Sequence, residues 1–449
     1  MRFPSLVCVV VFGLSAGAFA QSRSASTDRS SEVGMTFVRH LSQGRYAEAA
    51  GMVDDSVKAQ MNHNVLKGVW TNMSEGKGEF RNVGTPTVTN LVVYKWVLVP
   101  CEWVNGRIRL RVVVNSQRKV VGLFVVPPAL KSAGVRPPYL HTEVTTRDIT
   151  VGKAPWSLPG TLTLPKSGKP KGGVVLVHGS GPNDRDETLG PNKPFRDLAL
   201  GLAEKGIATL RYDKRTYAHK LVLASKLALK GGITVDEEVV DDALAGLNVL
   251  RAQPELANVP VYVLGHSVGA ILAPEIAARD GKVAGTVLLA GPARPMEDVI
   301  VDQLTYLGSP DVGQVRQQME GIRKHTLKPD EKVMSAPAAY WYDLCGRDAE
   351  VAVKTAAGLK CGILVVQGGR DYQSTTDDFK LWQAALGKRP KATLKLFEDL
   401  NHLFATGEIK AIPDEYNDET HVDARVIDLI AAWSVEPGGV TTRDGNGSR

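Results

Sequence analysis

The stretch "YVLGHSVGA", residues 262–270, places Ser267 between two glycines in the pattern G-x-S-x-G. Glycine supplies 44 of the 449 residues, so this pattern alone is weak evidence for any function. The flanking residues add more, because the apolar run at 259–264 predicts a strand that enters the motif and residues 270–278 predict a helix that leaves it. The sequence therefore predicts that Ser267 lies on a sharp turn between a strand and a helix, which is the local structure of a nucleophilic serine.

Apolar runs and amphipathic segments alternate on both sides of this motif. The runs rich in Val, Ile and Leu predict strands within 172–181, 207–213, 259–264, 285–291, 361–368 and 392–398. Helical spacing of apolar residues predicts helices at 195–206, 270–278 and 422–433, and a capping box at 234–237 predicts the start of another. Nearly continuous apolar strands between helices indicate a mostly parallel sheet covered on both faces, so the predicted fold class is α/β.

A serine hydroxyl needs a base and an orienting acid before it can act as a nucleophile at neutral pH. Asp371 follows the fifth of these predicted strands, and His402 follows the sixth. The carboxyl ends of parallel strands meet at one edge of a sheet, and the order Ser, Asp, His is the one expected there. The sequence predicts that Asp371 orients His402 and that His402 takes the proton of Ser267. Asp377 and Asp378 lie where a further helix begins and are predicted to be first-turn carboxylates.

A tetrahedral intermediate on the serine would carry a negatively charged oxygen that needs hydrogen-bond donors. The stretch "VHGSG" at 177–181 follows a predicted strand, and the backbone N–H groups of Ser180 and Val268 are the predicted oxyanion-hole donors. A phosphate-binding loop would need the pattern G-x-x-x-x-G-K-[ST], which the chain lacks. His266 is predicted to be structural rather than catalytic, because adjacent side chains at such a turn point away from one another.

The beginning of the chain has the composition of a targeting segment. Residues 1–20 contain one arginine, a short apolar run and a small-x-small ending at Ala20, which together predict a signal peptide cleaved after Ala20. The apolar run is shorter than a membrane-spanning helix needs, so no stable membrane insertion is expected. The protein is therefore predicted to be exported, either to the periplasm or out of the cell.

A small separate domain is predicted after this segment. The Ser-rich residues 21–33 are predicted to be a linker. Residues 34–126 combine helical spacing with strands at 91–99, 107–114 and 120–126, so a small α+β domain is expected, with a tight turn at Asn105-Gly106. The proline-rich residues 127–137 predict a second linker, and 437–449 are predicted to be a flexible tail.

Charge and cysteine content exclude some classes of function. Lysine and arginine number 54 against 48 aspartate and glutamate residues, a formal net charge of +6, and they are scattered, so no nucleic-acid partner is indicated. Cys101, Cys345 and Cys361 allow at most one disulfide, and we interpret them as buried free thiols because no C-x-x-C pattern occurs. The sequence does not define an oligomeric state.

Six motifs together carry a resemblance to the α/β-hydrolase superfamily, in particular to secreted bacterial EstD-type carboxylesterases and serine aminopeptidase-like hydrolases. They are "HGSGPNDRDE" (178–187), "LRYDKR" (210–215), "GHSVGA" (265–270), "YWYDL" (340–344), "QGGRDYQ" (367–373) and "LNHLF" (400–404). The resemblance covers residues 138–436. It implies cleavage of small-molecule carboxylic esters, of short to medium acyl chain length, through an acyl-enzyme on Ser267 without a metal or organic cofactor.

The resemblance extends to the smaller domain and has one departure. Residues 34–126 are similar to a domain of unknown function, with a nuclear-transport-factor-like cone, that often precedes such hydrolases. Thr216-Tyr217 follow "RYDKR" where a glycine is common in relatives, which leaves the shape of that loop and its effect on substrate choice open.

Helical spacing between about residues 292 and 350 predicts a small cap over Ser267. Tyr340, Trp341 and Tyr342 are either core residues of this segment or lining of a substrate pocket. A peptidase with the same triad is the alternative function, and Glu297 and Asp298 would then read a free amine. A non-catalytic binding protein is a further alternative, although all triad positions are filled.

Overall fold

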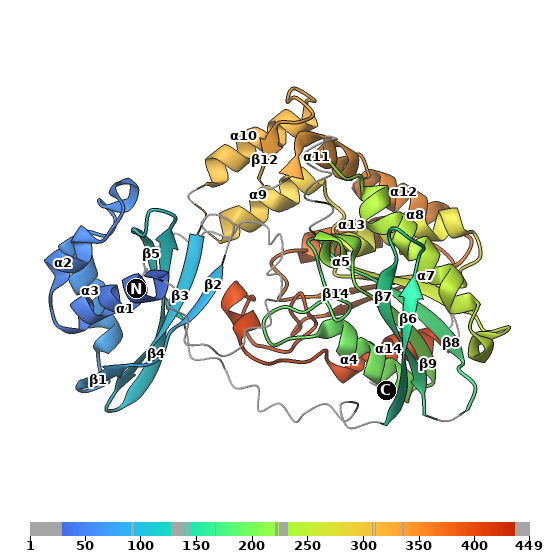
Figure 1. Cartoon of the computed structure of the whole chain (residues 1–449), viewed down its shortest axis with the longest axis horizontal. Coiled ribbons are helices and arrows are strands. Elements are labelled where there is room, and N and C mark those ends of the chain that lie inside the picture. Colours follow the sequence, from blue (N-terminus) through green and yellow to red (C-terminus); the bar gives the residue numbers. More distant parts are fainter. Residues whose placement is uncertain are drawn as a thin grey trace, which may run out of the picture. The chain divides into compact units, whose positions relative to one another are not determined.

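The computed structural model describes residues 29–90, 94–126, 139, 143–166, 168–220, 223, 232–307, 309, 311–334, 336–347 and 349–435. The chain forms two compact units whose main boundary lies between Ser132 and Ala133 (Figure 1). The predicted signal peptide, the linker at 127–137 and the tail at 437–449 lie outside the described residues. No described helix has the length and apolar character that a membrane span needs.

The first unit is an antiparallel sheet with helices packed on it. Its sheet has the order β1-β3-β4-β5, with β2 paired to β3, and α1 packs against β3 and β4. The elements are α1 (Arg29–Ser42), α2 (Tyr46–Gly51), η1 (Asp55–Val57), α3 (His63–Ser74), β1 (Phe80–Val83), β2 (Thr87–Asn90), β3 (Tyr94–Trp103), β4 (Gly106–Asn115) and β5 (Val120–Val126).

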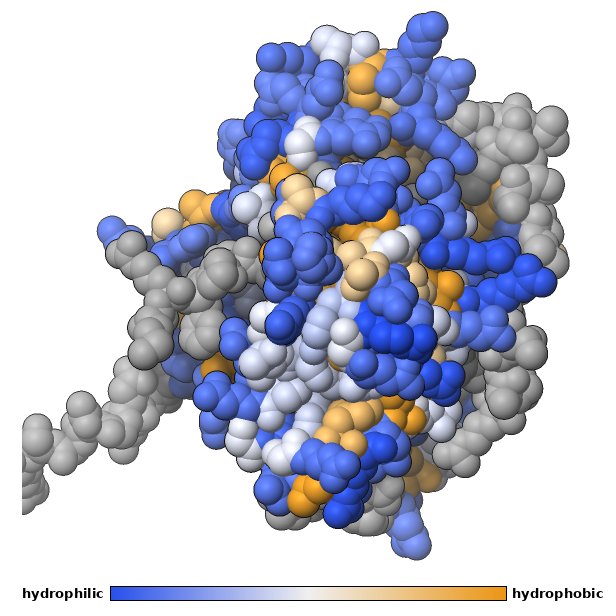
Figure 2. Space-filling view, turned by 90° about the vertical axis from the view of Figure 1, so that its left-hand side faces the viewer, coloured by the Kyte–Doolittle hydropathy of each residue, from blue (hydrophilic) through white to orange (hydrophobic). Residues whose placement is uncertain are grey.

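Hydrophilic residues cover most of the face drawn in Figure 2, with apolar residues in small separate patches.

Two predictions for this unit are wrong in detail. Helix α1 begins at Arg29, so the last five residues of the predicted linker, 29–33, are helical. This first turn is held against the unit, since Ser30 is buried and Val33 packs against the core. The tight turn lies one residue earlier than predicted, since Gly106 already pairs with Trp103 across β3 and β4. The linker was predicted from the Ser-rich composition of residues 21–33. Composition alone does not distinguish a linker from the first turn of a helix.

The second unit contains the predicted parallel sheet (Figure 1). Its eight strands have the order β15-β14-β11-β10-β8-β9-β7-β6, and all neighbouring pairs from β15 to β9 are parallel. Strands β7 and β6 are antiparallel to their neighbours and extend one edge. The strands are β6 (Val144–Val151), β7 (Leu158–Pro165), β8 (Gly172–Val177), β9 (Ile207–Tyr212), β10 (Val261–His266), β11 (Gly285–Leu289), β14 (Gly362–Gly368) and β15 (Ala392–Phe397).

Helices cover both faces of this sheet because alternate strand residues point to opposite sides. Helices α4 (Pro194–Glu204) and α14 (Ala424–Val435) pack together on one face, over a cluster that includes Val174 and Leu264. Helices α7 (Asp241–Arg251) and α8 (Val268–Asp280) pack on the other face, where Gly246 of α7 lies against Val175. The remaining elements are α5 (Arg215–Ala218), η3 (Asp236–Val240), η4 (Pro254–Leu256), α12 (Ala349–Gly358), α13 (Thr376–Leu386) and η5 (Pro413–Asn417).

The segment predicted to be a cap forms its own small helical group. It contains α9 (Met296–Tyr306), α10 (Val312–Arg323), β12 (Lys332–Val333), β13 (Ala336–Pro337) and α11 (Ala338–Cys345). Helix α12 instead packs against α8 and α13, which flank the sheet. Cys101, Cys345 and Cys361 form no disulfide among the described residues, and the first two are buried as interpreted from the sequence, whereas Cys361 is only half-buried.

Candidate active site

Ser267 lies on a strained turn between β10 and α8. Its backbone has φ 55° and ψ −120°, a conformation that non-glycine residues rarely adopt and that is concentrated at functional sites. A Cβ atom added to Gly265 would lie 2.0 Å from the carbonyl oxygen of Gly269, and one added to Gly269 would lie 2.3 Å from that of Val177. Both motif glycines are therefore required by close backbone approach, and the predicted strand–turn–helix geometry is present.

Asp371 and His402 are hydrogen-bonded to each other and buried. Nδ1 of His402 lies 2.7 Å from Oδ2 of Asp371, and the two residues are 4% and 1% exposed. The other carboxylate oxygen accepts hydrogen bonds from the backbone N–H groups of Gln373 at 2.7 Å and Ser374 at 3.1 Å. An ionised carboxylate can only accept, so Nδ1 donates and Nε2 of His402 is left with a lone pair.

The loop that carries His402 lies against the residue that precedes Ser267. Nε2 of His266 lies 2.9 Å from the carbonyl oxygen of His402, and the two imidazole rings are 4.7 Å apart between centroids. The structure thus places Ser267, Asp371 and His402 after β10, β14 and β15 at one edge of the sheet. Within the described residues the hydroxyl of Ser267 has no hydrogen-bond partner.

The loop after β8 lies directly beside Ser267. A Cβ atom added to Gly179 would lie 3.0 Å from Cβ of Ser267. The N–H of Gly179 is occupied, because it donates to Oε1 of Glu187 at 2.6 Å. In the described part of the chain the N–H groups of Ser180 and of Val268, the first residue of α8, have no such acceptor, so both are available to a ligand.

Glu187 and His266 form a buried pair that connects this loop to the histidine loop. Nδ1 of His266 lies 2.9 Å from Oε2 of Glu187, while its Nε2 faces the carbonyl oxygen of His402. Burial alone would lower the pKa of His266, but its contacts with Glu187 and with the carbonyl oxygen of His402, together with the charge of Asp371, outweigh burial and raise the pKa. Burial alone would raise the pKa of Glu187, but its contacts with His266 and with the N–H of Gly179, together with the nearby His178, lower the pKa. Glu187 was missed by the sequence analysis, because a lone acid in a loop carries no signal.

His178 is a further buried histidine, in the loop after β8 that also carries Glu187, and it is held neutral. Burial lowers its pKa to about 4. Its Nε2 lies 3.0 Å from the carbonyl oxygen of Asp184, and its ring packs against Phe195 and Tyr212. These contacts fix the start of the loop to β9 and α4.

Ion pairs join two of the sequence motifs, "HGSGPNDRDE" and "LRYDKR". Arg185 makes a bidentate contact with Asp213, at 3.0 and 3.1 Å, and Arg211 pairs with Asp186. Bidentate guanidinium–carboxylate contacts fix orientation as well as distance. The loops after β8 and β9 are therefore tied to each other, which gives these motif residues a structural role.

Trp341, Tyr342, Glu297 and Asp298, which the sequence singled out, contact other residues of the cap through their polar atoms. Tyr342 donates to the carbonyl oxygen of Leu327, and Trp341 donates to that of Val333. The carboxylate of Asp298 lies 2.7 Å from the guanidinium of Arg323, and that of Glu297 lies 3.9 Å from it.

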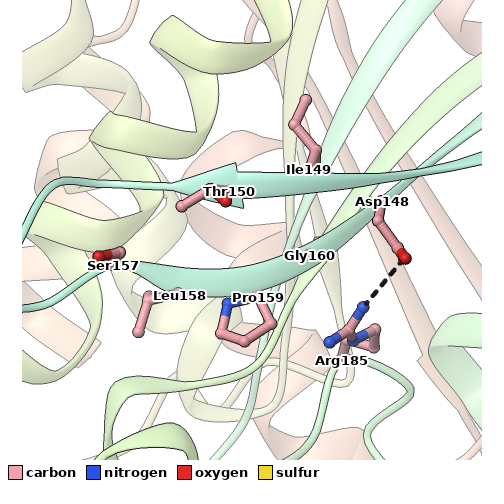
Figure 3. A pocket seen from close by; sticks show the side chains of 8 residues that line it. All are labelled: Asp148, Ile149, Thr150, Ser157, Leu158, Pro159, Gly160 and Arg185. Atoms are coloured by element: carbon pink, nitrogen blue, oxygen red, sulfur yellow. Dashed lines mark ion pairs between the residues drawn. The ribbon is translucent and has the colours of Figure 1, made fainter.

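The second unit also contains a cavity of about 550 Å³ (Figure 3). It is lined by Asp148, Ile149, Thr150, Ser157, Leu158, Pro159, Gly160 and Arg185, which come from β6, β7, the connection between them and the loop after β8. None of the predicted site residues lines it. Among the described residues, no three His, Cys, Asp or Glu side chains form a group that could hold a metal ion.

Residues 174–411, more than half of the chain, match the model of the alpha/beta hydrolase family, and the chain therefore belongs to this family. Residues 35–123 match a model described as a protein of unknown function, DUF3887. The chain is 40% identical to Esterase EstD of Thermotoga maritima over 405 residues, which cover 89% of this chain and 94% of that protein.

Two solved structures show lower similarity. The esterase domain of a Rhodothermus marinus protein has a TM-score of 0.40 at 16% identity, and the match covers 66% of this chain and 100% of that domain. An esterase of Pyrococcus furiosus has a TM-score of 0.41 at 15% identity, with 65% and 92% covered.

Proposed function

We propose that this protein hydrolyses carboxylic esters of short to medium acyl chain length, with Ser267, His402 and Asp371 as its catalytic triad. The observation that carries the proposal is the buried Asp371–His402 pair at the same sheet edge as a serine on a strained turn. The 40% identity with Esterase EstD over nearly the whole of both chains supports the same reaction.

The reaction would proceed through an acyl-enzyme. Oγ of Ser267 attacks the ester carbonyl carbon while Nε2 of His402 takes the hydroxyl proton, and Asp371 stabilises the imidazolium that forms. Collapse of the tetrahedral intermediate breaks the bond to the alcohol, which leaves with the proton from His402. A water molecule, deprotonated by His402, then attacks the acyl carbon, releases the carboxylic acid and restores the serine.

The negatively charged oxygen of each intermediate needs donors that are already in place. The N–H groups of Ser180 and Val268 have this role in our proposal. Val268 follows Ser267 in the chain, and Ser180 follows Gly179, whose added Cβ would lie 3.0 Å from Cβ of Ser267. The N–H of Gly179 is excluded because Glu187 already accepts from it. The N-terminus of α8 adds the positive end of the helix dipole on the same side.

Substitution of Ser267 by alanine tests the proposal. With a short-acyl nitrophenyl ester, we expect Ser267→Ala to lower kcat about 10⁴-fold or more at an unchanged melting temperature. Ser157→Ala is the matched control, because Ser157 is also half-buried but lines the separate cavity. A fluorophosphonate should label Ser267. Near wild-type turnover in folded Ser267→Ala protein, or labelling at another residue, would refute the triad.

We also propose that the protein is exported, on the pattern of residues 1–20 alone. Mass spectrometry of the protein purified from its native host would show a mature N-terminus at Gln21. An intact Met1 there would contradict export by this signal.

A further inference from the structure

Lys214 is a buried cation next to the loop that carries Ser180. It follows β9 in the motif "LRYDKR", and its side chain is only 3% exposed. Its Nζ donates to the carbonyl oxygen of Gly179 at 3.0 Å and lies 2.9 Å from Oε1 of Glu238. A buried ammonium group is strongly destabilising unless it is paired and hydrogen-bonded, so these two contacts determine where it can be.

The carbonyl of Gly179 and the N–H of Ser180 belong to one trans peptide group, in which they point in opposite directions. The hydrogen bond from Lys214 to the carbonyl therefore aims the N–H of Ser180 away from the lysine. Asn183 also donates to this carbonyl, at 3.4 Å, and to the carbonyl of Ser180, at 3.1 Å. The peptide is thus held from its carbonyl side, while the loop lies beside Ser267.

The contact with Lys214 has an electrostatic effect as well as a geometric one. A positive charge at a carbonyl oxygen polarises the peptide group and strengthens its N–H as a donor. The ammonium group is itself held in place, because Glu238 is 5% exposed and its second carboxylate oxygen accepts from the hydroxyl of Tyr340 at 2.7 Å. Tyr340 belongs to α11 of the cap, so a chain of polar contacts runs from the cap to the loop.

We propose that Lys214 is a positioning residue for ester hydrolysis, which orients and polarises the Gly179–Ser180 peptide so that the N–H of Ser180 binds the oxyanion. Glu238 and Tyr340 hold the ammonium group of Lys214 in this place. The lysine acts through the peptide and not by contact with the substrate. The inference rests on the function proposed above, and it adds a role for "LRYDKR" beyond joining two loops.

The test first establishes that the full-length wild-type chain hydrolyses an ester and that this activity depends on Ser267. It then compares variants of the same full-length chain. Lys214→Met alone would leave the carboxylate of Glu238 buried and unpaired, so the main variant is the double change Lys214→Met with Glu238→Gln. Lys193→Met is the matched control, because Nζ of Lys193 bonds Asp186 at 3.0 Å in the same region without reaching Gly179. Fluorophosphonate titration counts the active sites, so kcat refers to competent enzyme only.

We expect the double variant to lower kcat about 10- to 100-fold with KM within about threefold of wild type. This loss is smaller than the 10²- to 10³-fold effect of deleting an oxyanion donor, because the donor stays in place. The inhibition constant of a trifluoromethyl ketone, whose serine adduct carries the same oxyanion, should rise by the factor by which kcat/KM falls. If Lys214 had a purely structural role, the double variant would have fewer active sites. Its kcat per active site and the inhibition constant of the ketone would then be unchanged.

Two results would overturn the inference while leaving the triad intact. One is a folded double variant with kcat within about threefold of wild type. The other is a lower kcat with an unchanged inhibition constant for the ketone. If the double variant does not fold, Tyr340→Phe is the deciding variant, because it removes only the hydroxyl that holds Glu238. A fall of about two- to fivefold in kcat with a matching rise in the inhibition constant of the ketone supports the inference. No change in either quantity refutes it. Loss of Ser267 dependence in the wild-type assay would instead refute the proposed function.

Discussion

Asp371 accepts the Nδ1–H of His402 at 2.7 Å with one carboxylate oxygen, while backbone N–H groups hold the other. The two residues are 31 positions apart in sequence and follow neighbouring parallel strands, β14 and β15. Because both carboxylate oxygens are occupied, the imidazole has one favoured tautomer and one favoured orientation. This relationship leads to the first prediction.

Asp371→Asn should lower kcat by orders of magnitude, about 10⁴-fold, while KM changes little. The amide can present N–H₂ to Nδ1, which favours the wrong tautomer of His402. Steady-state kinetics on a nitrophenyl ester measures the effect. Asp377→Asn is the control, because Asp377 is an exposed residue that pairs with Lys380 in the same helix. Equal losses in the two variants would remove Asp371 from its proposed role.

Asp378 has a larger part in the structure than its expected place in a first helical turn. It completes the capping box of α13 with Thr375, and it also accepts from the backbone and guanidinium of Arg294 at the start of the cap. It is fully buried. We expect Asp378→Asn to lower the free energy of unfolding by about 3 kcal/mol, the cost of breaking a buried ion pair, rather than by a few tenths. Denaturant unfolding would measure this, and a change below about 0.5 kcal/mol would contradict it.

Gly265→Ala should disrupt the turn that carries Ser267. The new methyl group would lie 2.0 Å from the carbonyl oxygen of Gly269, so the backbone must move and activity should fall with stability. Gly313→Ala is the control, because Gly313 lies in α10 with nothing within 4 Å of the added carbon, and it should be neutral or slightly stabilising. Melting temperatures of the two variants decide the point, and similar values for both would show that the turn can relax.

The parallel core, and the meeting of three strand ends at the candidate site, could be predicted because both depend on local signals that agree. Apolar runs predict buried strands, and strand ends in a parallel sheet share an edge, so Ser267, Asp371 and His402 were placed together from sequence. Strand β6 was missed because it is the edge strand, mostly exposed and of mixed composition. Strand β7 (Leu158–Pro165) is mostly buried, but its prolines and glycine interrupt the apolar pattern that predicts a strand. Glu187 and Lys214 were missed as site residues because their roles depend on contacts between loops that are distant in sequence.

Acid should destabilise the protein through His178. The pKa of this buried histidine is about 4, below its ordinary 6.5, so between these values the unfolded chain binds one proton more than the folded protein. Its contribution to stability is fully present above pH 6.5 and is lost as the pH falls towards 4, at up to about 1.4 kcal/mol per pH unit.

Denaturant unfolding at a series of pH values checks this effect. We expect His178→Gln to show a shallower loss of stability between pH 6.5 and 4 than the wild type. His325→Gln, at an exposed histidine, should keep the wild-type slope. Parallel curves for the wild type and His178→Gln would mean that His178 does not titrate as its burial requires.

The last prediction separates esterase from aminopeptidase activity. Recognition of a free amine requires an available negative charge in the pocket, whereas a short acyl ester needs an apolar wall and oxyanion donors. The two cap acids considered above as readers of an amine both face Arg323: Asp298 lies 2.7 Å from its guanidinium and Glu297 lies 3.9 Å from it. Their charge is thus at least partly neutralised within the cap.

We therefore expect kcat/KM for short-acyl nitrophenyl esters to exceed that for matched aminoacyl anilides by at least about 10³-fold, or about 4 kcal/mol in transition-state stabilisation. Glu297→Gln should leave the ester activity unchanged. Glu320→Gln is its control, because Glu320 lies 3.7 Å from the same guanidinium but is exposed on α10. Comparable efficiencies on the two substrate series, with the anilide activity lost in Glu297→Gln and kept in Glu320→Gln, would establish Glu297 as an amine-binding residue and the protein as an aminopeptidase.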